Sequence, residues 1–306
     1  MGERNLGLSI FCHAVLLVGA AFVCLPLYFA FVAGSLTLEE VQQAPFPLVP
    51  GSHFIENVAI AWRQGDFSQL FLNSIIVTGG IVIGKLAISL IAAFAVTYFR
   101  FPFRMTAFWL IFVSLMLPVE VRIIPTYEAV ADAAGPIRWL SGITGFAGLL
   151  ENLTGYSIET SLKWNMVNTY GGLILPLIAS ASATFLFRQF FLTVPEELCE
   201  AAKLDGAGPL KFFKDVLLPL STANIAALAI ILFLYGWNQY LWPLLFTTDK
   251  TMATAILGLK ELVPVSDSVP AWNIAMSAAL FVMLPPAVII LFMQRWFTKG
   301  LVDSGK

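Results

Sequence analysis

Three ionisable side chains stand inside long apolar stretches of the sequence: Lys85, Glu120 and Arg122. A charged side chain in a membrane-spanning segment costs about 2.5–3.5 kcal/mol, so each needs a partner, a water-filled path or a route to the membrane surface. Pro118 and Pro125 flank Glu120 and Arg122, and proline interrupts a helix because it lacks the backbone N–H donor. Interrupted helices at membrane depth line a cavity or are buried in protein. We therefore expect Glu120 and Arg122 to point inward from an unwound turn.

A second polar cluster is the aromatic segment GWNQYLWPLL, which starts at residue 236. Counted at about 1.5 Å per residue from the inner helix ends, Arg122 and Asn238 lie roughly 26 and 24 Å along their spans. The two residues therefore lie at about the same depth in the membrane. At that depth, aromatic faces and amide groups can hold a polyol against an apolar wall. The predicted pathway residues are Glu120, Arg122, Trp237, Asn238, Tyr240 and Trp242.

Each of these features also has a purely structural interpretation. The tryptophans can be packing or membrane-interface residues, Glu120 and Arg122 can form a structural ion pair, and Lys85 can snorkel to the membrane surface. Gly80 and Gly84 form a G-x-x-x-G pair, which predicts close packing of a neighbouring helix.

The composition is that of a membrane protein. Of 306 residues, 58% are hydrophobic and 12% charged, with mean hydropathy +0.84, whereas about a quarter of a soluble domain is charged. The net charge of -2 provides no basic surface for nucleic acid. Three isolated cysteines indicate neither a disulfide framework nor a metal site. Phosphate-loop, zinc-protease and nucleophile-elbow motifs are absent from the sequence, so we expect no catalytic residues.

Six stretches have the roughly 20 apolar residues that a spanning helix needs. An even number of spans places both termini on one side of the membrane. With the N-terminus inside, the cytoplasmic segments carry ten Lys and Arg and the outer segments five, a bias that favours cytoplasmic termini. The sequence therefore predicts an all-α, polytopic membrane protein with one domain over residues 1–306. The predicted spans are 10–33, 71–98, 105–128, 169–190, 222–246 and 273–293.

The longest cytoplasmic segment, residues 191–221, is predicted to form a helical hairpin. Thr193 and Pro195 supply a helix start, and two glutamates follow. Gly206 allows the positive φ of a tight turn, and Pro209 begins a second helix. From composition alone the hairpin is either an amphipathic helix on the lipid surface or a docking element for a soluble partner.

The segment EAAKLDGAGPLKFFKDVLLP resembles the E-A-A…G…(I/V)-x-L-P signature of the inner-membrane permeases of bacterial ABC importers. In that family the loop is the coupling helix, seated in a cleft of the ATPase subunit. The likeness covers nearly the whole chain and is closest to the sugar-type branch, through PVEVRIIPTYEAV, GWNQYLWPLL and FMQRWFTKGLVDSGK. Within that branch it is most similar to the second permease subunits of sn-glycerol-3-phosphate uptake systems. The resemblance implies ATPase coupling by Glu200, Ala201, Ala202, Asp205, Gly206 and Pro219.

The resemblance also implies a function and a set of partners. The chain would form half of a translocation pathway for sn-glycerol-3-phosphate or related glycerophosphodiesters in the bacterial inner membrane. Its partners would be a homologous second permease subunit, a homodimeric ATPase and an extracytoplasmic solute-binding protein, with no nucleic acid. The chain itself would bind no cofactor, because the ATPase uses the ATP and Mg²⁺. The alternatives are a permease for a neutral sugar or polyol, a membrane-embedded enzyme and a secondary transporter.

Two features depart from the family pattern. The outer segment 129–168 is longer than expected, and LPLSTANIAAL lacks the second proline that sugar permeases commonly carry after L-P-L.

Overall fold

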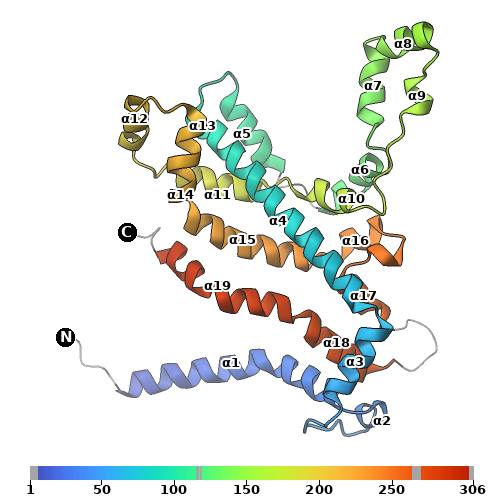
Figure 1. The fold of residues 1–306 in the computed structure, drawn as a ribbon. Helices are drawn as coiled ribbons and strands as arrows, with labels where there is room; N and C mark the ends of the chain where they lie inside the picture. Colours follow the sequence, from blue (N-terminus) through green and yellow to red (C-terminus); the bar gives the residue numbers. More distant parts are fainter. Residues whose placement is uncertain (1–5, 115–116, 118, 264–269, 303–306) are drawn as a thin grey trace. The chain divides into compact units, whose positions relative to one another are not determined.

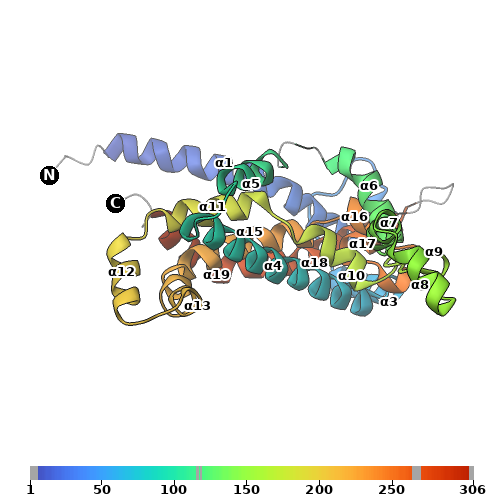
Figure 2. The same cartoon turned by 90° about the horizontal axis from the view of Figure 1, so that it is seen from above.

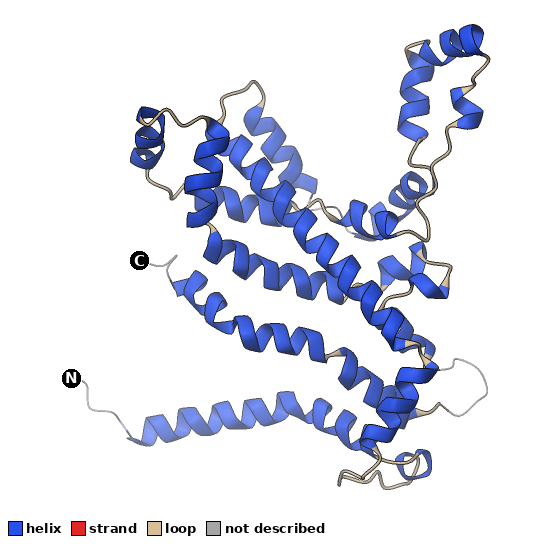
Figure 3. Ribbon diagram, viewed as in Figure 1, coloured by secondary structure: helices blue, strands red, loops and turns tan. Residues whose placement is uncertain are grey.

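The computed structural model describes residues 6–114, 117, 119–263 and 270–302. Every regular element in these ranges is a helix (Figure 3), which confirms the predicted all-α class. The chain forms two compact units. Unit 1 comprises Met1–Phe71 and Ala255–Ala287, and unit 2 comprises Leu72–Thr254 and Val288–Lys306.

Within the described residues, three helices are long and apolar enough to cross a membrane: Gly7–Ser35, Phe67–Tyr98 and Trp272–Met293. Two bent helix pairs also qualify when each is taken as one span. These pairs are Tyr170–Leu177 with Ala181–Phe191, bent by 47°, and Pro209–Leu220 with Thr222–Trp237, bent by 73°. Three to five spans therefore meet the criteria of length and composition, and the predicted count of six stays a prediction.

The predicted span 169–190 is broken rather than straight. It consists of α10 (Tyr170–Ile174), the short 3₁₀ turn η2 (Leu175–Leu177) and α11 (Ala181–Phe191). Pro176 lies in η2 and cannot donate a backbone hydrogen bond. The Ser180 hydroxyl then accepts a bond from the backbone N–H of Ala183 at 3.3 Å and so begins α11 as an N-cap.

The predicted span 105–128 is divided between α5 (Arg104–Val113) and α6 (Val119–Ala131). The expected unwinding around Glu120 and Arg122 was wrong, because both residues lie within α6 and this helix continues through Pro125. Proline removes one backbone donor, and here that loss does not end the helix. One turn of α6 also carries a side-chain bond, from the Thr126 hydroxyl to the Arg122 carbonyl at 2.6 Å.

Unit 1 is built around the packing of α18 against two other helices. Its core contacts join α18 (Trp272–Val282) to α1 (Leu6–Ser35) and to α3 (Phe54–Gln64). The unit also contains α2 (Leu38–Val41) and α17 (Ala255–Glu261). Most of the N-terminal half of α1 exposes apolar side chains, as expected for a helix that lipid or another subunit covers.

Buried amides connect the three main helices of unit 1. The Asn57 side chain donates to the carbonyls of Gly34 and Leu36, both at 2.8 Å, and accepts a bond from Asn273 at 3.1 Å. Gly34 allows a close approach here, because a Cβ there would meet the Ser277 backbone N at 3.0 Å and α18 would have to shift slightly.

Unit 2 is organised along α4 (Phe67–Tyr98), which belongs to it from Leu72 onward. The predicted close packing at Gly80 and Gly84 is confirmed, since a Cβ on either residue would collide with Ile174 or Ile178. Contacts between α5 and α11, and between α10 and α16 (Leu241–Phe246), complete the packing. Helix α15 (Thr222–Trp237) precedes α16, so the predicted span 222–246 is also divided.

Two helical excursions leave unit 2 at opposite ends (Figures 1 and 2). One, the inner hairpin, is formed by α12 (Glu196–Leu204) and α13 (Pro209–Phe212) and leads through the π-helical turn η3 (Phe213–Leu217) into α14 (Leu218–Leu220). The other, the outer excursion, is formed by α7 (Gly135–Ile143), α8 (Phe146–Thr154) and α9 (Ile158–Ser161). The remaining elements are the short turn η4 (Lys250–Met252) and the C-terminal helix α19 (Leu284–Val302).

Candidate functional site

A cavity of about 470 Å³ lies within unit 2 between α4, α5, α6, η2, α11, α15 and α16. This volume suits a small organic ligand, for which pockets of about 300–1,000 Å³ are usual. The polar residues that line it include two cations, and no Asp or Glu is among its described lining residues. Its polar lining consists of Lys85, Ser114, Arg122, Thr126, Ser180, Ser182, Thr184, Tyr235 and Gln239.

Lys85 is buried in the wall of this cavity, with only 6% of its surface exposed. Its Nζ lies 3.8 Å from the centre of the Tyr235 ring, a cation–π contact between α4 and α15. The interpretation that Lys85 snorkels to the membrane surface was therefore wrong. The ammonium group is held inside the helix bundle by an aromatic ring from another helix.

Arg122 lines the same cavity from α6 and is exposed. Lys85 and Tyr235 line this cavity as well, from α4 and α15. Glu120 lies in α6, but its side chain is outside the described residues, so its pairing with Arg122 stays a prediction. The structure thus places the predicted arginine at a cavity, and it adds Lys85 and Tyr235 to the same site.

The aromatic segment separates into residues at the cavity and residues in the core. Trp242 lines the cavity and stacks on Phe246 with ring centres 3.9 Å apart. Trp237 is only 2% exposed and stacks on Phe233, and the described cavity lining does not include it. Asn238 ends α15 as its C-cap, and Tyr240 precedes α16; neither is among the described lining residues. Of the predicted aromatic pathway residues, the structure therefore brings Trp242 alone to this cavity.

Sequence reasoning missed Tyr235 as a lining residue. Tyr235 and Gln239 are four residues apart, a spacing that places two side chains on one helix face. The Gln239 side-chain amide donates to the Tyr235 carbonyl at 3.1 Å, which links the two residues across the end of α15. This i, i+4 pair was the signal that could have identified the polar face of α15.

The inner hairpin has the turn that its sequence requires. Gly206 adopts φ of 73°, and nothing lies within 4 Å of a Cβ built on it. Helix α12 begins after Pro195, whereas the Thr193 hydroxyl donates to the Phe190 carbonyl and does not cap the helix. Of the predicted coupling residues, Glu200, Ala201 and Asp205 are exposed, and Ala202 is half-buried.

The tip of the inner hairpin exposes large apolar side chains. Leu204 is 89% exposed and Leu210 80% exposed, one on each side of the Gly206 turn. Beneath the tip, Phe212 is buried and meets the Tyr98 ring edge to face at 5.3 Å. A buried aromatic base therefore carries an exposed tip with apolar and acidic side chains.

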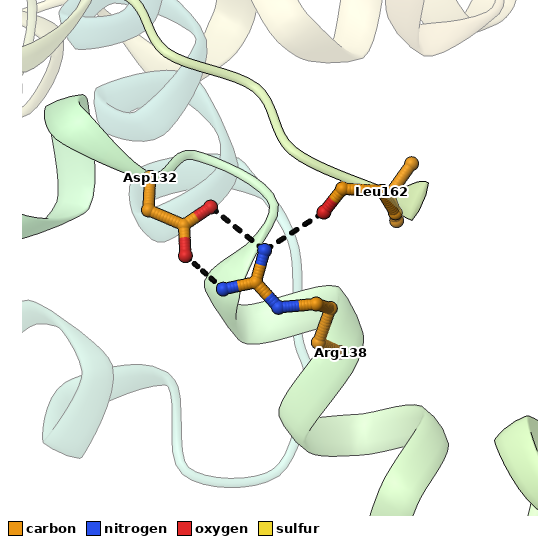
Figure 4. Close-up of polar contacts among 3 residues, drawn as sticks. All are labelled: Asp132, Arg138 and Leu162. Atoms are coloured by element: carbon orange, nitrogen blue, oxygen red, sulfur yellow. Dashed lines mark hydrogen bonds and ion pairs between the residues drawn. The ribbon is translucent and has the colours of Figure 1, made fainter. Parts of the chain in front are cut away.

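The outer excursion is held at its base by one arginine (Figure 4). Arg138 Nη1 donates to Asp132 Oδ1 at 2.9 Å and to the Leu162 carbonyl at 2.7 Å, and Nη2 contacts Asp132 Oδ2. These hydrogen bonds lower the pKa of the Asp132 carboxyl below its ordinary value. Arg138 therefore connects the start of the outer excursion, at Asp132, to the segment that returns from it, at Leu162.

Among the described residues, no group of three or more His, Cys, Asp or Glu side chains could hold a metal ion. The polar chemistry of unit 2 is instead that of two cations, hydroxyls and an amide around one cavity. Such a lining can bind an anion or a polyol.

Comparisons with known proteins identify the family. The family model of the binding-protein-dependent transport system inner membrane component matches residues 85–303. The chain is 46% identical over 312 aligned residues to the sn-glycerol-3-phosphate transport system permease protein UgpE of Yersinia pestis, and all of both chains is covered. The homologous permeases of Pectobacterium atrosepticum and Salmonella typhi are also 46% identical over their full length.

A solved structure shares the fold. A chain from the crystal structure of a bacterial ABC transporter involved in import of the acidic polysaccharide alginate matches with a TM-score of 0.74. The match covers 97% of this chain and 99% of that one at 16% identity, so it carries the fold alone. The proteins of this family are membrane transport components rather than enzymes, and the apolar helices agree with a multi-pass position in the inner membrane. The chain belongs to the family of binding-protein-dependent transport system inner membrane components.

Proposed function

We propose that this permease subunit forms half of the translocation pathway of an ABC importer for sn-glycerol-3-phosphate or related glycerophosphodiesters. The observation that carries the proposal is the 46% identity, over the full length of both chains, to permeases named for sn-glycerol-3-phosphate transport. The cavity of unit 2 supports an anionic substrate, because Lys85 and Arg122 line it and no described acidic residue does. A phosphate group loses hydration in such a cavity, and charge-assisted hydrogen bonds from the cations can replace it.

The proposed topology has six spans with both termini in the cytoplasm, in a single permease domain. The charge bias of the sequence supports it, with ten Lys and Arg in the inner segments against five in the outer ones. The proposed partners are a homologous permease subunit, two ATPase subunits that use ATP and Mg²⁺, and an extracytoplasmic binding protein. The matching alginate importer was also crystallised in complex with a substrate-bound periplasmic protein.

The inner hairpin is the proposed contact with the ATPase. Its exposed Leu204 and Leu210 offer apolar anchors, and the nearby Glu200 can pair with a basic residue of the partner. In this mechanism, closure of the ATPase dimer on ATP moves residues 196–218 as a rigid body. The spans then switch access from the cytoplasm to the outside, where the binding protein delivers the solute.

The test is uptake by the complete complex in proteoliposomes, with a panel of glycerol phosphate, a glycerophosphodiester, glycerol and a neutral sugar. We expect ATP-dependent uptake of the phosphate compounds, competed by each other and not by the neutral solutes. Preferential uptake of a neutral sugar would overturn the substrate assignment.

Coupling is tested separately with Glu200→Lys, and Glu197→Lys on the same exposed helix is the matched control. We expect Glu200→Lys to impair uptake and ATPase co-purification more than Glu197→Lys does, because it places a repelling charge where a basic partner residue is expected. Equal behaviour of the two variants would contradict a coupling role for Glu200.

A further inference from the structure

We infer that Lys85 and Arg122 together form a two-cation site for the phosphate group of the solute, and that this site favours a phosphate monoester over a phosphodiester. The inference rests on the proposed function, since it assigns recognition of the solute's charge to the cavity of this chain. It adds Lys85 as a specificity-determining residue and names the form of phosphate that the cavity accepts best.

The first argument is the burial of Lys85. Its side chain is more than nine-tenths buried, yet it belongs to the lining of the 470 Å³ cavity. Within the described residues no carboxylate lies within ion-pair distance of it, and its contact is with the Tyr235 ring. A ring compensates only part of the lost hydration of an ammonium group. The Lys85 ammonium therefore has no counterion among the described residues, and an anion in the cavity would supply one.

The second argument is the position of Arg122. It reaches from α6 the same cavity that Lys85 and Tyr235 line from α4 and α15. Two like charges that share a cavity repel each other. Core packing does not need such a pair, since apolar side chains of similar size would fill the space without repulsion. An anion between the two cations is attracted to both of them, and this attraction offsets their mutual repulsion.

The third argument concerns the charge of the solute. A phosphate monoester carries about -1.5 to -2 at neutral pH and presents three acceptor oxygens. A phosphodiester carries a single negative charge. Two cations around one cavity interact with both forms, but the second cation gains most when the anion has a second charge. A guanidinium can bind two oxygens in a fork, and an ammonium group can bind a third.

The experiment measures kcat/KM for uptake of glycerol phosphate and of a glycerophosphodiester by the complete complex. The binding protein is saturated with the solute, and the concentration of this loaded binding protein is varied. Lys85→Met keeps the length of the side chain and removes its charge, and Lys85→Arg keeps the charge. Lys163→Met is the matched control, because Lys163 is an exposed lysine of the outer segment and does not line the cavity. Membrane level and assembly are measured for every variant.

We expect Lys85→Met to lower kcat/KM for the monoester about tenfold and for the diester about threefold, the difference reflecting the lost charge–charge interaction. Lys85→Arg should keep the preference for the monoester, Arg122→Gln should shift it in the same direction as Lys85→Met, and Lys163→Met should change neither substrate. Equal losses for the two substrates in Lys85→Met would overturn the inference.

A structural role for Lys85 predicts something different. If Lys85 only neutralises Glu120, Lys85→Met should reduce assembly, and the double change with Glu120→Gln should restore assembly and monoester uptake together. Such a rescue would overturn the two-cation site. The proposed function has its own readout, which is uptake by the wild-type complex. If the wild-type complex takes up neither phosphate compound, both the proposed function and this inference are overturned. If it takes up both compounds and Lys85→Met keeps the same preference, this inference alone is overturned.

Discussion

The inner hairpin and the outer excursion both interrupt unit 2, but different forces hold them. The inner hairpin stands on buried aromatic rings, with Phe212 packed against Tyr98 and a hydrophobic cluster that includes Phe187 and Leu217. The outer excursion is tied at its base by the polar contacts of Arg138, and many of its apolar side chains are exposed. A packed base transmits displacement because close-packed interiors are stiff. Packing therefore joins the inner hairpin to the helices below it, which the polar contacts of the outer excursion do not do.

The largest effect is expected from the aromatic base of the inner hairpin. Phe212 is 5% exposed, and Phe212→Ala should destabilise the hairpin locally by about 3–5 kcal/mol through the lost transfer energy and the cavity it leaves. We expect uptake to fall at least tenfold and hydrogen exchange over residues 196–220 to become faster. Leu153→Ala in α8 is the control from the outer excursion, since that side chain is 75% exposed and its loss should change stability by less than about 0.5 kcal/mol. Similar effects of the two variants would remove the distinction between the regions.

A smaller effect is expected at the glycine turns. Gly206 in the inner hairpin and Gly155 in the outer excursion have nearly the same conformation, with φ of 73° and 71°, and a Cβ at either position would meet open space. Valine at either position should cost about 1–2 kcal/mol, because a β-branched residue rarely adopts positive φ. We expect Gly206→Val to reduce uptake severalfold. The stimulation of ATP hydrolysis by the binding protein should fall as well.

Gly155→Val is the matched control for this turn, since it introduces the same backbone strain at the opposite end of unit 2. Its expected result is unchanged uptake with faster hydrogen exchange confined to residues 146–161. A loss of uptake equal to that of Gly206→Val would show that both excursions are coupled to transport.

Features set by local sequence were predictable. Long apolar runs predicted the helices α1 and α4, and Gly206 predicted a positive φ. The G-x-x-x-G pair predicted close packing, which the structure shows against Ile174 and Ile178. In each case the physical cause lies within a few residues of the feature: hydropathy over one helix, the absence of a Cβ, or the freedom of one backbone angle.

Features that depend on distant residues were not predictable in this way. Lys85 is held by Tyr235, which follows it by 150 positions, so its burial could not be inferred from α4 alone. At the base of the outer excursion Arg138 donates to the Leu162 carbonyl, 24 residues away, a contact that neither segment indicates by itself. Trp237 and Trp242 stand close together in sequence, but the break after α15 sends them to different surroundings. Patterns thus identified which residues were polar or aromatic at membrane depth, and tertiary contacts decided which of them reached the cavity.

The smallest expected effect is a pH dependence confined to the outer excursion. Hydrogen bonds from Arg138 lower the pKa of Asp132, so the folded excursion binds the ionised carboxylate more favourably than the unfolded chain does. This contribution is fully present above the unfolded pKa of about 3.9 and is lost as the pH falls through the lower folded value. Hydrogen exchange over residues 135–162, corrected for its intrinsic pH dependence, should therefore show constant protection from neutral pH down to about pH 5 and a decline in strongly acidic solution.

Asp132→Asn should remove that decline, and Arg138→Met should lower protection already at neutral pH. The inner hairpin, whose base is aromatic, should show no matching transition in the same samples, and a parallel decline there would mean that acid acts on the whole of unit 2 rather than on the Arg138 contact.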